Sequence, residues 1–301
     1  MKSNRRSFIS TAVGTAAASS LAFGSRSEAI EPIHREGPSG MKLSLAGYSF
    51  RKEFKAEPPI MTISEEFMQF AAENGLGAIE PTSYYFPEDA DRNYFLEYRR
   101  KAFLMGLTVS GTAIGNVFTH PKGPDRDKEL ALTRKWIDHA SEMGAPCIRI
   151  FAGKIQKGSN EEEARGFAIE CINESLEYAA EKGVFLALEN HGGIVSNADQ
   201  LLAIVREIDS EWFGVNLDTG NFHSADPYQE LQQAAPYAIT VQVKVEVKPE
   251  GQEKQPADLE RIVKILRGVG YRGFVALEYE AAEDARTAIP GYLKQLKALI
   301  G

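Results

Sequence analysis

Short, mostly apolar runs recur along this chain, and a segment with helical periodicity follows each run. The runs VFLALE (184–189) and FVALE (274–278) are examples. Side chains of a β-strand point to alternate faces, so the final glutamate of each run would share a face with the residues two and four positions before it. Strands are predicted near residues 42–48, 77–82, 107–113, 146–151, 184–189, 213–218, 239–245 and 273–279. The pattern therefore predicts eight successive units of a strand followed by a helix.

Eight such units over residues 41–301 predict an α/β protein built as a single (β/α)8 TIM barrel. The alternative is a doubly wound open sheet, but no glycine-rich phosphate loop follows the first predicted strand, as that fold would favour. The sequences Thr62-x-x-Glu65 and Ser159-x-x-Glu162 resemble capping boxes and predict helix starts. In a TIM barrel the active site lies at the carboxyl ends of the strands.

The first 40 residues do not follow this pattern. Asn4-Arg5-Arg6-Ser7 precedes a weakly apolar run of small residues, which predicts a twin-arginine export signal over residues 1–29 and a periplasmic protein. The alternative is a disordered tail. Residues 30–40 are polar and rich in proline and glycine, which predicts a linker or arm. Beyond the N-terminus no run of 18 apolar residues occurs, so no transmembrane helix is expected.

Charge and cysteine content narrow the choice of partners. The net charge is −8, and removal of residues 1–29, which carry +3, leaves −11. An acidic surface of this kind disfavours nucleic acid and anionic membranes as partners. The periplasm is oxidising, but Cys147 belongs to a predicted strand and Cys171 to the apolar stripe of a helix, with another strand between them. We therefore expect no disulfide.

Four polar residues end successive predicted strands in the second half of the chain. They are Glu189, Asp218, Gln242 and Glu278. Three carboxylates and an amide oxygen at one rim are the hard ligands that divalent cations such as Mg²⁺ and Mn²⁺ prefer. The alternative is that the carboxylates are paired with Arg149 or Lys244 for structural reasons, because a buried carboxylate needs a cation or donors.

The predicted strand 239–245 supports a polar interior at this rim. Thr240, Gln242, Lys244 and Glu246 alternate with four valines. An edge strand exposed to solvent would show the same alternation, but a closed barrel has no edge. The valines are therefore expected to face the helices, and the polar residues are expected to face a cavity inside the barrel.

Four motifs together resemble the xylose isomerase-like TIM barrel family of sugar phosphate isomerases and epimerases. They are Leu188-Glu189-Asn190-His191, Asp218-Thr219-Gly220-Asn221, Gln242-x-Lys244 and Leu277-Glu278-Tyr279-Glu280. The resemblance covers residues 41–301, and the family includes hydroxypyruvate isomerase, ketose 3-epimerases, inosose dehydratase and, more distantly, endonuclease IV. It implies one divalent ion, Mn²⁺, Mg²⁺ or Co²⁺, bound by the four strand-end residues. Most members carry histidine where this chain has Gln242, while the hydroxypyruvate isomerase branch resembles it in having glutamine.

Further residues are candidates for contact with a substrate. His120, His191 and His223 follow the third, fifth and sixth predicted strands, and each is either a rim residue or a loop histidine without a role. Arg149 is expected to point inward and hold a substrate oxygen, and Glu80 matches a family position near the substrate. Tyr84, Tyr85 and Phe86 form either a wall for a sugar ring or part of the core.

The resemblance also implies a chemistry. The metal would hold the carbonyl and a neighbouring hydroxyl oxygen of a keto-sugar or hydroxy-keto-acid and stabilise an enediolate, while Glu189 and Glu278 move the proton and Lys244 adds positive charge. A metal-dependent isomerase or epimerase, alone or as a homo-oligomer, is the first hypothesis. A lyase or dehydratase of an oxidised sugar and a non-catalytic sugar-binding barrel are the alternatives. Five histidines and an acidic surface disfavour a DNA-repair endonuclease.

Overall fold

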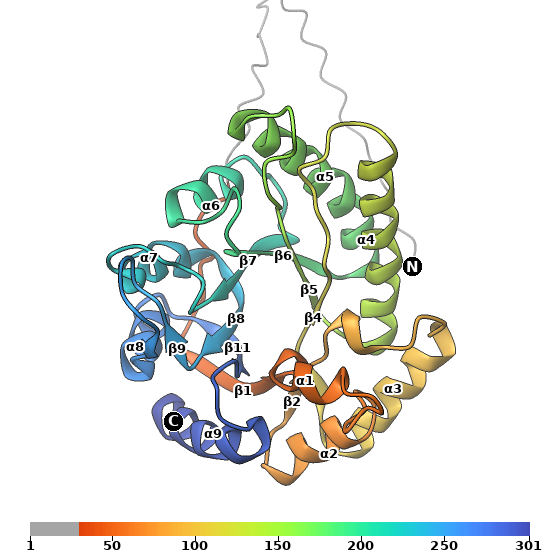
Figure 1. The fold of residues 1–301 in the computed structure, drawn as a ribbon, viewed down its shortest axis with the longest axis vertical. Coiled ribbons are helices and arrows are strands. Elements are labelled where there is room, and N and C mark those ends of the chain that lie inside the picture. The colour runs from red at the N-terminus through yellow and green to blue at the C-terminus, as the bar shows by residue number, and fades with distance from the viewer. Residues whose placement is uncertain (1–29) are drawn as a thin grey trace, which may run out of the picture.

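A ring of parallel strands enclosed by helices forms the centre of this protein (Figure 1). The structure, a computed structural model, describes residues 30–301, so the predicted export signal lies outside the described residues. The strands are β1 (Gly40–Ala46), β2 (Ala78–Glu80), β3 (Thr108–Val109), β4 (Thr112–Ala113), β5 (Cys147–Ile150), β6 (Phe185–Glu189), β7 (Phe213–Asp218), β8 (Ala238–Lys244), β9 (Glu246–Val247), β10 (Gln255–Pro256) and β11 (Arg272–Glu278).

The order of the strands closes the barrel. Nine strands form one sheet in the order β3-β2-β1-β11-β8-β7-β6-β5-β4. The short strands β3 and β4 together occupy the predicted third strand, and a parallel bridge between Thr82 and Ala113 joins the two ends of the sheet. The predicted TIM barrel is therefore confirmed, with one strand interrupted at Ser110-Gly111.

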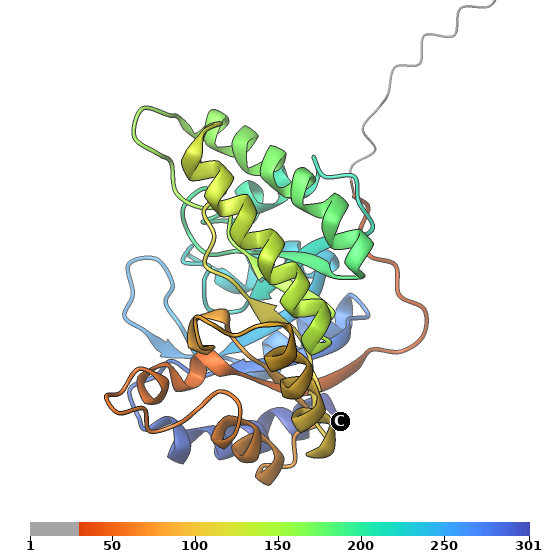
Figure 2. The same cartoon turned by 90° about the vertical axis from the view of Figure 1, so that its right-hand side faces the viewer.

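Helices cover the outside of the barrel. They are α1 (Arg51–Phe54), α2 (Glu66–Glu73), α3 (Arg92–Leu104), α4 (Pro124–Met143), α5 (Glu161–Lys182), α6 (Ala198–Val205), α7 (Pro227–Ala234), α8 (Leu259–Gly268) and α9 (Ala285–Ile300). The long helices α4 and α5 lie side by side (Figure 2). Among residues 30–301, no helix is long and apolar enough to span a membrane.

Both predicted capping boxes are wrong. The box of α5 lies one residue later and is formed by Asn160 and Glu163, whose side chains exchange hydrogen bonds with each other's backbone nitrogens. At α2 the N-cap is Glu65, which makes no side-chain cap hydrogen bond, and the backbone nitrogen of Thr62 donates to Glu66. Consecutive polar residues at each site offer more than one acceptor, so spacing alone did not select the right one.

The core lies between the sheet and the helices. Val241, Val243, Val245 and Val247 are buried, as their alternation predicted, and Gln242 and Lys244 lie inside the barrel mouth. Glu246 departs from the predicted pattern. It begins the hairpin β9–β10, where its side chain forms an ion pair with Lys254.

An N-terminal arm, residues 30–39, packs against the opposite end of the barrel from the carboxyl ends of the strands. The nitrogen of Ile33 donates to the oxygen of Pro236, and Arg35 donates to the oxygen of Ala238. A cavity of about 850 Å³ lies between the arm and the starts of β5, β6, β7, β8 and β11. It is therefore separate from the end at which TIM barrels place their active sites.

Candidate active site

The predicted site residues meet at the carboxyl ends of the strands. The rim site consists of Glu80, Arg149, Glu189, Asp218, Gln242, Lys244 and Glu278, all of which are buried except the partly buried Lys244. The register of β8 explains their proximity: Gln242 pairs with Asp218 of β7, and Lys244 pairs with Glu278 of β11. Residues two apart on β8 point to the same face, so both side chains enter the barrel mouth.

Lys244 is the cation that joins the carboxylates on this side. Its Nζ lies 2.5 Å from Glu278 Oε2 and 3.4 Å from Asp218 Oδ2, and it also contacts Glu280 Oε1. Burial alone would lower the pKa of Lys244, but the surrounding carboxylates outweigh this effect and raise it well above its usual value. The ammonium group is therefore charged at neutral pH.

Arg149 plays the same part on the other side of the site. Its Nε lies 2.8 Å from Glu189 Oε2, and Asn221 Nδ2 donates to Glu189 Oε1 over 2.8 Å. Arg149 also donates through Nη1 to the oxygen of Ile114 over 2.6 Å. The Glu189 carboxylate is thus held from both oxygens, and its orientation is fixed by β5 and the segment that follows β7.

Gln242 is held by two neighbours. Asn216 Nδ2 donates to Gln242 Oε1 over 2.8 Å, and Gln242 Nε2 donates to Glu80 Oε1 over 2.5 Å. Because a carbonyl oxygen accepts two hydrogen bonds, Gln242 Oε1 keeps one lone pair for another partner.

Burial disfavours the charged form of the carboxyl groups. It raises the pKa of Glu80 to about 7, against the hydrogen bond from Gln242. Burial also raises the pKa of Glu189, which Arg149 opposes. The pKa of Asp218 lies well above its usual value because of burial and the neighbouring Glu189 and Glu278, although Lys244 opposes the shift. The carboxylates of the rim site thus carry more negative charge than Lys244 and Arg149 can neutralise.

The donors of the rim site suit a hard divalent cation. Asp218 Oδ2 is buried and accepts no hydrogen bond within the described residues, and the three carboxylates and Gln242 Oε1 are oxygen donors of the type that Mg²⁺ and Mn²⁺ prefer. Within residues 30–301, no three histidine, cysteine, aspartate or glutamate side chains are grouped closely enough to hold a metal as they stand. Lys244 and Arg149 hold the carboxylates, so entry of an ion requires Lys244 to move away from Asp218.

The candidate histidines differ in their positions. His191, which is exposed and close to Glu189 along the chain, lies against Phe151, with ring centroids 4.3 Å apart and an angle of 38° between the ring planes. His223 bonds through Nδ1 to the oxygen of Lys248 and lines a cavity of about 210 Å³ beside Lys244. His120 takes part in none of the hydrogen bonds or ion pairs that join the rim site in the described part of the chain.

Sequence reasoning missed the residues that position the site. Asn216, Asn221 and Glu280 contact Gln242, Glu189 and Lys244. Asn216 shares the inner face of its strand with Asp218, and this alternation was a usable signal. Asn221 and Glu280 stand in the four motifs, but only the fold shows which partner each one contacts.

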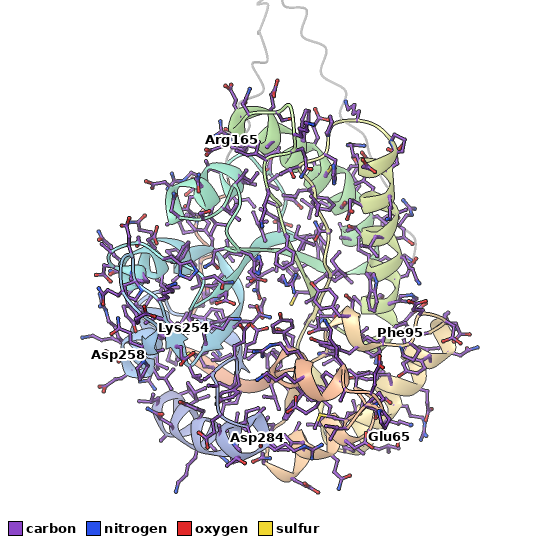
Figure 3. The ribbon with its side chains drawn as sticks, viewed as in Figure 1. Glu65, Phe95, Arg165, Lys254, Asp258 and Asp284 are labelled. Carbon is purple, nitrogen blue, oxygen red and sulfur yellow. The ribbon has the colours of Figure 1, made fainter. Side chains whose placement is uncertain are left out.

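One neighbouring ion pair lies outside the site. Lys254, labelled in Figure 3, forms a pair with Glu246 at 3.6 Å in which its side chain is 58% exposed. Solvent screens such a pair strongly, so it differs physically from the Lys244 network and serves as a comparison for it.

Proteins of known activity resemble this chain. L-ribulose-5-phosphate 3-epimerase UlaE from Escherichia coli (strain K12) is 28% identical over 193 residues, which cover 60% of this chain and 68% of the relative. D-Psicose 3-epimerase from Clostridium cellulolyticum H10, solved with D-tagatose, superposes with a TM-score of 0.70 at 16% identity, covering 86% of this chain and 99% of the other.

A second solved structure with the same fold is that of a probable dehydratase. The probable 3-DHS dehydratase AsbF from Bacillus anthracis gives a TM-score of 0.64 at 20% identity, covering 85% of this chain and 99% of its own. The sequence profile of the Xylose isomerase-like TIM barrel matches residues 68–299. This match includes every residue of the rim site and most of the barrel, but not β1. The chain belongs to the xylose isomerase-like TIM barrel family.

Proposed function

We propose that this protein is a divalent-metal-dependent isomerase or epimerase of a keto-sugar or hydroxy-keto-acid. The observation that carries the proposal is the pair Glu189 and Glu278, two buried carboxylates on β6 and β11, each in contact with its own cation. The strands β7 and β8 separate them in the sheet, so the two carboxylates reach a substrate in the mouth from different sides. Removal of a proton by one and its return by the other changes the configuration at carbon.

The metal would be held by Glu189, Asp218, Gln242 and Glu278. A bound divalent ion polarises a carbonyl as a Lewis acid and makes the neighbouring C–H bond more acidic. Mn²⁺ and Mg²⁺ suit these donors best, and Co²⁺ is the next choice. The buried Asp218 Oδ2, which lacks a hydrogen bond, supports this assignment.

The cations of the site would stabilise the charge that develops on the substrate. When a proton leaves carbon, negative charge moves onto the substrate oxygens. Arg149 is already oriented by Glu189, so little reorganisation opposes its action. Lys244 would act from the position that it takes when the ion enters. His191, His223, His120 and Glu80 would contact the substrate hydroxyls.

The relatives support the epimerase class. The relative UlaE is an L-ribulose-5-phosphate 3-epimerase, and a D-psicose 3-epimerase is among the structures with the same fold. Epimerisation and isomerisation begin with the same proton abstraction, which Glu189 and Glu278 would perform in this proposal.

NMR in D₂O tests this proposal. The protein, loaded with Mg²⁺ or Mn²⁺, is incubated with a panel of keto-sugars and hydroxy-keto-acids. Deuterium is expected next to the carbonyl with the carbon skeleton kept. If metal is shown to be bound and no compound of a broad panel exchanges, the proposal is refuted and a non-catalytic sugar-binding barrel becomes the favoured function.

A dehydratase is the second candidate because an acid lies beside the base. The ammonium group of Lys244 contacts Glu278, so one group can remove a proton while the other protonates a departing hydroxyl. The fold is shared with the structure described as a dehydratase. Loss of water in the same NMR experiment would favour this candidate.

We also propose that residues 1–29 direct export by the twin-arginine route to the periplasm. The support is the Arg5-Arg6 pair and the weakly apolar run after it. Fractionation of cells that produce the full chain tests this proposal, with an Arg5→Lys, Arg6→Lys double variant as the control. We expect the wild-type protein in the periplasm and the variant in the cytoplasm. Equal distribution of the two proteins would refute export by this route.

A further inference from the structure

Asn190 follows Glu189 directly at the carboxyl end of β6, and its side chain clamps the end of the neighbouring strand β7. Its Nδ2 donates to the backbone oxygen of Asp218 over 2.9 Å, and its Oδ1 accepts from the backbone nitrogen of Asp218 over 2.9 Å. One side-chain amide therefore binds both backbone polar groups of a single residue. Asn190 is fully buried, so solvent does not compete for these two hydrogen bonds.

This clamp continues the sheet beyond the end of a strand. The ladder between β6 and β7 stops at the pair Glu189 and Asn216, two residues before Asp218. Buried backbone groups need hydrogen-bond partners, and beyond this point the backbone of β6 no longer supplies them. An asparagine side chain carries one carbonyl oxygen and one NH₂ group, so it offers an acceptor and a donor as a peptide group does. The amide of Asn190 therefore takes the place of one more backbone rung.

The clamp sets the position of Asp218 relative to Glu189. Asp218 Oδ1 accepts from the nitrogen of Gly220 over 2.8 Å, which fixes the direction of the carboxylate. Its Oδ2 accepts no hydrogen bond within the described residues. Because Asn190 is the next residue after Glu189, the clamp ties the backbone of one carboxylate to the backbone of the other. The side-chain hydrogen bonds of Asn190 go to the backbone of Asp218 and leave both carboxylates free for other partners.

We propose that Asn190 is a positioning residue, which holds Glu189 and Asp218 at the separation that a divalent ion requires. This inference rests on the proposed function, because that proposal makes both residues metal ligands. A divalent ion binds tightly only when its ligands keep a defined geometry, and the partners behind the ligands maintain that geometry. Loss of the clamp should therefore lower metal affinity in addition to stability.

Asn116 forms the same type of clamp at another point of the rim and provides a matched control. Its Nδ2 donates to the backbone oxygen of Phe151 over 2.7 Å, and its Oδ1 accepts from the nitrogen of Phe151 over 2.9 Å. Asn116 is also buried. Phe151 directly follows β5, and its side chain has no atom that could bind a hard cation. Removal of either clamp breaks two buried hydrogen bonds, but only the clamp of Asn190 holds a proposed ligand.

Titration of the full chain with Mn²⁺ alone tests the proposal without need of turnover. Electron paramagnetic resonance measures the free ion, and urea denaturation with a chelator measures stability. Asn190→Ala and Asn116→Ala should lose similar stability. Asn190→Ala should bind Mn²⁺ roughly 10–100-fold more weakly than the wild type, as is typical when a partner behind a metal ligand is removed. Asn116→Ala should bind Mn²⁺ as the wild type does.

Asn190→Ser gives a second measurement in case the alanine variant does not fold. Its hydroxyl is too short to span both backbone groups, so its affinity for Mn²⁺ should also fall. Unchanged affinity in a folded Asn190 variant, or an equal loss of affinity in Asn116→Ala, would overturn the positioning role and leave the proposed function standing. Failure of the wild type to bind Mn²⁺ would overturn the positioning role together with the metal site of the proposed function.

Discussion

Lys244 Nζ lies 2.5 Å from Glu278 Oε2, and the two residues face each other across the neighbouring strands β8 and β11. Their side chains are 12% and 8% exposed. Water therefore solvates neither charge well, so each charged group is stabilised mainly by the other. The same contact places a proton donor beside the proposed base, and its energetic and catalytic consequences can be measured separately.

Lys244→Met should destabilise the metal-free protein. The substitution keeps an apolar side chain of similar length but leaves the buried carboxylates of Asp218 and Glu278 without their cation. Loss of one partner of a buried pair costs about 3–5 kcal/mol. Urea denaturation in the presence of a chelator measures this difference in the free energy of unfolding.

Lys254→Met is the control for this change, because Lys254 is exposed in its pair with Glu246. It should alter the free energy of unfolding by less than about 1 kcal/mol. Added Mn²⁺ should stabilise Lys244→Met more than it stabilises the wild type, because the ion would supply the missing positive charge. Equal stabilisation of both proteins would show that Mn²⁺ does not replace the charge of the missing ammonium group.

Glu278→Gln should abolish turnover and keep the fold. The amide has the shape of the carboxylate but cannot accept a proton from carbon, and loss of such a group lowers the rate by roughly 10²–10⁴-fold. The rate of deuterium exchange with the first active keto-sugar measures the effect, and circular dichroism checks the fold. Glu283→Gln, at an exposed position, should retain activity. A fully active Glu278→Gln protein would remove this residue from the mechanism.

Stability should fall at alkaline pH because of Cys171. Burial raises the pKa of its thiol from the usual value to about 11, against the effect of Arg126. From pH 9 to 11 the unfolded chain loses this proton while the folded protein keeps it, so the free energy of unfolding decreases as pH rises. Cys171 contributes at most about 1.4 kcal/mol per pH unit to this slope, reduced by solvent screening near Arg126. Burial also raises the pKa of the Cys147 thiol, so Cys147 adds a contribution of its own.

Chemical denaturation at several pH values from 8.5 to 10.5, a range chosen around these pKa values, checks this prediction. Cys171→Ala lacks the thiol and should show a shallower decline, although its smaller side chain lowers stability at every pH. Identical slopes for the two proteins would contradict a raised pKa. Both cysteines are free in the structure, so no disulfide contributes to the measured stability.

Much of the barrel could be predicted from the sequence, because its strands are short and their inner and outer faces differ in polarity. The run FVALE is an example: Val275 and Leu277 are fully buried under helices, and Glu278 ends the strand at the rim. Details that depend on a choice between neighbouring polar residues were not predictable. The cap of α5 is one such detail, because Ser159 and Asn160 are both suitable caps.

The rim site was predictable as a set of residues but not as a set of contacts. The carboxyl ends of parallel strands meet, so four strand-end residues had to be close together. The pairing of Lys244 with Glu278 depends on the register between β8 and β11, which are separated along the chain by α8. The hydrogen bond from Asn216 to Gln242 likewise depends on the register between β7 and β8. That register shifts between Val215 and Asn216. Alternation within one strand contains no information about register.

Gln242→His should change the preference of the protein among metals. An imidazole nitrogen is a softer donor than an amide oxygen and favours Zn²⁺ and Co²⁺ over Mg²⁺ and Mn²⁺. The substitution also removes the amide that donates to Glu80 and accepts from Asn216, so a change in bound metal must be separated from a change in fold. Competitive loading with equimolar Mn²⁺, Co²⁺ and Zn²⁺, followed by elemental analysis, measures the preference.

Gln252→His supplies the comparison, because Gln252 lies exposed in the loop between β9 and β10. It adds a histidine at the same end of the barrel without altering the donors at the rim, so its metal preference should match that of the wild type. The two variants together distinguish a ligand from an added surface site. If both variants load the same metals as the wild type, Gln242 is no metal ligand, and its contacts with Asn216 and Glu80 account for its place in the rim site.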